Sequence, residues 1–123
     1  MSEAFDRPAQ RPLLDVVLDR HAEGAVVIRP RGEVDLLTAP RFAAGMSDAI
    51  DGGATLVVVD LGEVTFFGSA GVASLARAAE RAIEVGAGFR LVVGESMASR
   101  VLEISGLTQV LEMRATVAAA LAG

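Results

Sequence analysis

Ser69 is the residue of this sequence most suggestive of covalent chemistry, because it stands in the run Phe67-Gly68-Ser69-Ala70-Gly71. The run approaches the nucleophile elbow G-x-S-x-G, but that motif requires glycine where Phe67 stands, and its catalytic histidine follows the serine. The single histidine, His21, lies well before Ser69 in the chain. We therefore interpret His21 as a surface residue in the first turn and do not expect Ser69 to be a catalytic nucleophile.

Other enzyme motifs are incomplete as well. The chain has no lysine, which a Walker A phosphate loop needs, and Gly86-Ala87-Gly88 lacks the third glycine of a dinucleotide-binding fingerprint. Cysteine is absent, which excludes disulfides and thiolate metal ligands. The sequence thus predicts a protein that is not an enzyme and that uses no cofactor.

A pair of carboxylates follows the second predicted strand, in Gly32-Glu33-Val34-Asp35. Side chains two residues apart on a strand share a face, so Glu33 and Asp35 can point the same way. Two carboxylates without further ligands are weak evidence for a metal site. The residues alone favour a solvated loop in which Asp35 or Thr38 holds the start of the next helix.

Ser69 also stands at the expected start of a helix, where its hydroxyl can cap the first turn. A plain cap explains the residue on its own. The same position tolerates a phosphate group, because free N–H groups and the helix dipole stabilise added negative charge. Gly71 would leave the backbone bare beside Ser69, which would help a second protein approach.

Composition narrows the class of partner. The chain has 123 residues and a net charge of −5, which disfavours binding to a phosphate backbone, so no nucleic-acid partner is expected. Its apolar runs are far shorter than the roughly 20 residues that cross a bilayer, so no direct membrane insertion is expected. The N-terminus lacks the apolar stretch of a secretory signal, which predicts a cytoplasmic protein.

The elements that must position these residues follow from apolar periodicity and from glycine and proline breaks. Residues 1–12 are expected to form a disordered N-terminal tail, and 13–123 a single α/β domain. It should contain an open, mostly parallel, four- to five-stranded sheet with about four helices. The expected strands are 16–18, 25–29, 56–59, 89–93 and 110–111, and the expected helices are 38–50, 69–85, 96–104 and 116–122.

Four short motifs, in register over one domain, resemble the STAS family of anti-sigma factor antagonists, from about Asp15 to Leu121. The motifs are Gly32-Glu33-Val34-Asp35 with Thr38, Val59-Asp60-Leu61, Ser69-Ala70-Gly71-Val72, and Ser105-Gly106-Leu107. The resemblance implies a protein that binds an anti-sigma factor with serine kinase activity and so frees a sigma factor. It also implies that the kinase phosphorylates Ser69, which ends binding, and that a serine phosphatase restores it.

The same resemblance implies a partner-binding surface on the two loops and on the exposed stripe of the Ser69 helix. Its expected members are Glu33, Asp35, Thr38, Gly68, Ala70, Gly71, Val72, Ala73, Ser74 and Arg77. The family usually has aspartate where Gly68 stands, and often a second hydroxyl where Ala70 stands. An alternative within the fold is a free-standing STAS subunit of a membrane lipid-transport (ABC) complex, which would bind its partner without phosphorylation.

Overall fold

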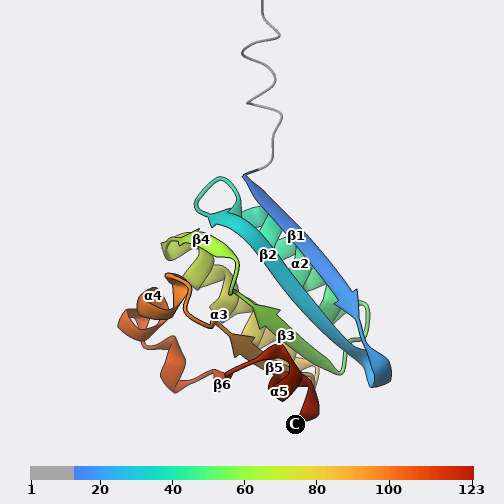
Figure 1. Ribbon diagram of the computed structural model, residues 1–123. Helices are drawn as coiled ribbons and strands as arrows, with labels where there is room; N and C mark the ends of the chain where they lie inside the picture. Colours follow the sequence, from blue (N-terminus) through green and yellow to red (C-terminus); the bar gives the residue numbers. More distant parts are fainter. Residues whose placement is uncertain (1–12) are drawn as a thin grey trace, which may run out of the picture.

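A six-stranded sheet with helices packed against it forms the framework of the computed structural model, which describes residues 13–123 (Figure 1). The expected tail at residues 1–12 lies outside the described residues. The strands are β1 (Leu14–Arg20), β2 (Ala25–Val34), β3 (Leu56–Asp60), β4 (Val64–Phe67), β5 (Gly88–Val92) and β6 (Glu112–Arg114). The helices are α2 (Ala39–Asp51), α3 (Ser69–Glu84), α4 (Ala98–Ser105) and α5 (Val117–Ala122), with 3₁₀ turns at Ala22–Gly24 and Leu107–Gln109.

The sheet is mostly parallel, as predicted. Its strand order is β1-β2-β3-β5-β6, with β4 paired to β2 beside this path. Among residues 13–123, only the β1–β2 hairpin is antiparallel, and every other pairing is parallel. The central strand β3 carries Val57, Val58 and Val59, all fully buried, because helices cover it from both sides.

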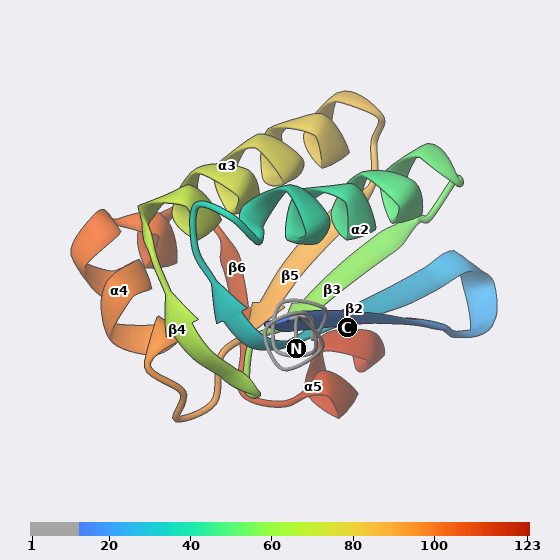
Figure 2. The same cartoon turned by 90° about the horizontal axis from the view of Figure 1, so that it is seen from above.

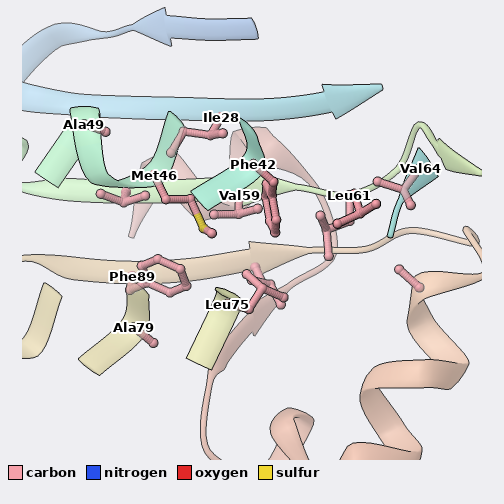
Figure 3. Packing of buried hydrophobic residues seen from close by; sticks show 14 of the residues in the cluster. Ile28, Phe42, Met46, Ala49, Val59, Leu61, Val64, Leu75, Ala79 and Phe89 are labelled. Carbon is pink, nitrogen blue, oxygen red and sulfur yellow. The ribbon is translucent and has the colours of Figure 1, made fainter. Parts of the chain in front are cut away.

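Figure 2 shows α2 and α3 side by side over one face of the sheet and α5 against the other face. The main core lies under α2 and α3, where Phe42, Met46 and Leu75 pack onto the sheet (Figure 3). A smaller cluster, Val27, Val58 and Val92 with Ala120, lies under α5. The α/β class and the four α-helices agree with the sequence-based expectation.

Two strands differ from that expectation. The strand β4 was not predicted, and it brings the sheet to six strands instead of four or five. Its residues are buried at the two ends and exposed in the middle, so they show no alternation. The last strand is Glu112–Arg114 and not 110–111, because Leu107–Gln109 forms a 3₁₀ turn that delays it.

The long strand β2 determines where the functional residues lie. Its first half, Ala25–Ile28, pairs with β3, and its second half, Gly32–Val34, pairs with β4. The two parallel strands β2 and β4 therefore end side by side, with Val34 opposite Phe67. The chain leaves β2 toward α2 and leaves β4 toward α3, so both helices begin at the same edge of the sheet.

Candidate functional site

The two motif-bearing loops lie next to each other at the carboxyl ends of β2 and β4. The N–H of Gly68 donates a hydrogen bond of 2.9 Å to the carbonyl oxygen of Val34. This bond joins the end of β2 to the residue that precedes Ser69. The two loops on which the resemblance implies a partner-binding surface are therefore neighbours, and binding sites in open α/β sheets commonly form at such strand ends.

Hydrogen bonds fix the loop between β2 and α2. The Oδ1 atom of Asp35 accepts from the N–H groups of Leu37 at 2.9 Å and Thr38 at 3.0 Å. The Thr38 hydroxyl donates to the carbonyl oxygen of Glu33 at 2.6 Å and accepts from the N–H of Asp35 at 2.9 Å. Asp35 and Thr38 therefore hold the start of α2, which is the structural role that their residue types favoured.

Electrostatics agree with this role for Asp35. The N–H of Thr38 is the main reason that the pKa of the Asp35 carboxyl lies below its usual value, with further hydrogen bonds from the Thr38 hydroxyl and Leu37. Hydrogen bonds to a carboxylate favour its charged form. Asp35 is therefore ionised at neutral pH and holds the turn that precedes α2, and Glu33 is the carboxylate of the pair that stays exposed to solvent.

The fixed loop carries two leucines that sequence reasoning missed. Leu36 and Leu37 are 82% and 84% exposed, although they are large apolar side chains in a hydrogen-bonded turn. Phe66 of β4, 45% exposed, lies beside Gly68 on the neighbouring loop. The signal in the sequence is a pair of leucines between Asp35 and Thr38, where a solvated loop would carry polar residues.

Ser69 is the first residue of α3, and its side chain is exposed. The cap position belongs to Gly68, whose extended backbone (φ −95°, ψ −176°) precedes the helix without any side-chain cap. The prediction that Ser69 caps the helix is therefore wrong, because Ser69 already lies within the first turn. Its position at the N-terminus of a 16-residue helix still places it where added negative charge is stabilised.

Gly71 serves the core and not the surface. It is buried, and a Cβ atom at this position would lie 2.8 Å from Cε1 of Phe67 and 2.9 Å from Cγ1 of Val34. The missing side chain thus allows α3 to approach the ends of β2 and β4. The idea that Gly71 offers bare backbone to a partner is wrong for this reason.

Ser74 is also buried, at 3% exposure, and its hydroxyl donates to the carbonyl oxygen of Ala70 at 2.9 Å. It does not belong to the exposed stripe in which the sequence analysis placed it, whereas Ala73 and Arg77 are exposed as expected. The face of α3 that packs on the core therefore includes Ser74. Its buried residues are Gly71, Ser74, Leu75, Ala79 and Ala82.

Two grooves flank the first half of α3. One, of about 480 Å³, lies between α2 and α3 and is lined by Leu36, Ala70, Arg77 and others. The second, of about 380 Å³, lies between α3 and α4, and Ser69 forms part of its lining. Ala73 lines both grooves and so forms the ridge between them.

Asp60 and Gly106, which belong to the other two motifs, have structural roles. Asp60 accepts from the Arg29 side chain at 3.1 Å, and this bond is the main reason that the pKa of Arg29 is raised. Gly106 ends α4 in the left-handed conformation, with φ of +83°.

Within residues 13–123, no cluster of three acidic or histidine side chains is suited to hold a metal ion. No helix in this range combines the length and apolar character needed to cross a membrane.

Comparisons with known proteins agree with this architecture. The STAS domain family model matches residues 17–120. The anti-sigma-F factor antagonist RsfB of Mycobacterium tuberculosis is 31% identical over 100 residues, which is 81% of each chain. A crystal structure of an anti-sigma factor antagonist from Mycobacterium paratuberculosis superimposes with a TM-score of 0.82 at 27% identity, covering 89% of this chain and 92% of that one.

A second similar structure is the Bacillus cell fate determinant SpoIIAA in its phosphorylated form. It is 25% identical, has a TM-score of 0.64, and the match covers 81% of this chain and 91% of that chain. The family match spans most of the chain, and the strand order, the paired loops and the exposed serine at the start of α3 accompany it. This chain belongs to the STAS domain family.

Proposed function

We propose that this chain is an anti-sigma factor antagonist, which binds an anti-sigma factor and so frees a sigma factor. The names of the similar proteins RsfB and the Mycobacterium paratuberculosis antagonist support this function. It is a function of binding and not of catalysis, in agreement with the incomplete enzyme motifs. We also propose a cytoplasmic location, because sigma factors act on the transcription machinery there.

The observation that carries the proposal is the position of Ser69. The side chain is exposed, lies at the start of α3 and stands next to the loop that presents Leu36 and Leu37. A serine protein kinase can reach such a hydroxyl without unfolding the domain. The phosphorylated form of the similar protein SpoIIAA supports phosphorylation as the means of control.

Phosphorylation of Ser69 would switch binding off for an electrostatic reason. A phosphate adds about −1.5 to −2 charges at pH 7. The N-terminus of α3 offsets part of this charge within the fold, so the folded state should lose little stability. Burying the dianion against a partner without matching cations costs several kcal/mol. The kinase is proposed to be the anti-sigma factor itself, and a serine phosphatase would restore binding.

The proposed partner surface joins the two loops and the exposed side of α3. Glu33 contributes an exposed carboxylate, while Asp35 and Thr38 contribute by fixing the loop. The start of α3 contributes Gly68 and the exposed Ala73 and Arg77, together with the partly buried Ala70 and Val72. Around Ser69 this surface is weakly polar, so a partner can cover it at a low cost of desolvation while the serine is unmodified.

The alternative function, as a subunit of an ABC lipid-transport complex, is not the one that the similar proteins support. Their names describe anti-sigma factor antagonists. The two functions differ in the partner that binds. An ATP-binding kinase-like protein is expected for the antagonist, and a transporter ATPase for the subunit.

The test begins with capture of partners from host lysate on the immobilised chain, followed by mass spectrometry. The recovered anti-sigma factor is then purified and incubated with the chain and ATP, and the labelled residue is located. Label is expected on the wild-type chain and on Ser47→Ala, an exposed helical serine used as control, but not on Ser69→Ala. Capture of a transporter ATPase, or label that persists in Ser69→Ala, would contradict the proposal.

A further inference from the structure

The groove between α3 and α4 is an apolar feature that the sequence analysis did not assign. It has a volume of about 380 Å³ and is lined by Val72, Ala73 and Ala76 of α3 and by Val101 and Ile104 of α4. Ser69 and Ser105 complete its lining. Ile104 is 79% exposed, so the edge of the groove is an apolar side chain that the fold itself does not cover.

The groove is continuous with the surface described above. Ser69 lines it directly, and Ala73 lines both this groove and the one between α2 and α3. A protein that contacts Ser69 therefore reaches the mouth of this groove.

We propose that the α3–α4 groove receives an apolar side chain of the anti-sigma factor, docked beside Ser69. This inference rests on the proposed function and adds the part of the surface that supplies affinity. A few side chains that fill well-packed pockets near the centre of an interface supply most of its binding energy. Ile104, Val101 and Ala76 are the residues that such a side chain would contact.

The groove also explains how one phosphate could block a large surface. Its described lining contains no cationic side chain, so the groove offers no ion-pair partner to a phosphate on Ser69. An apolar side chain seated in the groove would lie against the dianion and remove water from it without replacing the lost hydrogen bonds. Phosphorylation would then prevent docking while the fold stays unchanged.

The chain offers a matched pair of isoleucines for the test. Ile104 lines the groove and is 79% exposed, whereas Ile83 lies near the far end of α3 and is 75% exposed. The affinity of the purified anti-sigma factor identified above is measured by calorimetry for the wild type, Ile104→Ser and Ile83→Ser. We expect Ile104→Ser to weaken binding about tenfold or more, because it removes a buried apolar contact. Ile83→Ser should bind like the wild type.

A second pair of variants covers the case in which Ile104→Ser does not fold. Ala76→Leu fills the groove and should also weaken binding about tenfold, whereas Ala44→Leu places the same side chain on the exposed side of α2 and should not. If the wild type binds and the groove variants bind equally well, this inference is overturned and the proposed function stands. If the wild type does not bind the anti-sigma factor, the proposed function fails first.

Discussion

Replacing Thr38 with valine tests whether the loop that carries Leu36 and Leu37 is held in place by a single hydroxyl. Valine keeps the shape of threonine but removes the group that donates to the Glu33 carbonyl at 2.6 Å and accepts from the Asp35 N–H at 2.9 Å. Both backbone groups then depend on water. The change therefore isolates the hydrogen bonds from the packing of the side chain.

The expected loss follows from these two bonds. Each contributes about 0.5–1.5 kcal/mol net, and the site is partly exposed, so the total loss is about 1–2 kcal/mol. For a domain of this size, that loss lowers the melting temperature by roughly 4–8 °C. The chain has no tryptophan or tyrosine, so unfolding in urea is followed by circular dichroism at 222 nm.

The control is Thr65→Val, the same substitution at an exposed threonine of β4. Its free energy of unfolding should change by less than about 0.5 kcal/mol. If Thr38→Val is no less stable than Thr65→Val, the hydroxyl does not hold the loop, and the account of how Leu36 and Leu37 are presented is incorrect.

Three further perturbations test other parts of the structure. Asp35→Asn keeps an oxygen acceptor but loses the negative charge. Folding lowers the pKa of the Asp35 carboxyl. The charged carboxylate therefore stabilises the fold fully above about pH 3.9, and this stabilisation is lost as the pH falls through the pKa of the folded state. The difference in unfolding free energy between wild type and Asp35→Asn should therefore shrink between pH 7 and pH 3, and a difference that grows would contradict the role of the charged Asp35 in holding the turn. Gly71→Ala should lower the free energy of unfolding in urea by about 1 kcal/mol, since contacts of 2.8–2.9 Å between the new Cβ and the side chains of Phe67 and Val34 outweigh the gain in helix propensity. A higher free energy of unfolding would refute the packing argument. Gly68→Asp should raise the free energy of unfolding by a few tenths of a kcal/mol, because the extended backbone at this position suits a capping carboxylate. A lower free energy of unfolding would show that the edge of the Phe66 ring, 3.2 Å from the new Cβ, cannot move.

The sequence was sufficient for the elements with strong local patterns. The apolar run Leu56–Val59 became the central strand β3, and the periodic segment after Gly68 became α3. The strand β4 was not predicted, because its four residues show no alternation of buried and exposed side chains and pair with the second half of β2. Such a strand is defined by its partner, and a local pattern cannot reveal it.

The site was predicted in part. Parallel strands bring the Asp35 and Ser69 loops to the same end of the sheet, but the direct contact between the loops depends on β4, which was not predicted. The burial of Ser74 did not follow, because its hydroxyl is satisfied by the Ala70 carbonyl within the same helix and needs no solvent. The α3–α4 groove depends on how two helices far apart in sequence meet, which periodicity does not determine.

The release of the sigma factor is the measurement that tests the central claim most directly. A complex of the anti-sigma factor with a fluorescently labelled sigma factor is titrated with the unmodified chain and with the chain phosphorylated on Ser69, and anisotropy reports the free sigma factor. We predict that the unmodified chain releases the sigma factor. The phosphorylated chain should need a roughly thousandfold higher concentration for the same release, which corresponds to a loss of about 4 kcal/mol in binding free energy. Release at equal concentrations of the two forms, or no release by the unmodified chain, would contradict the account.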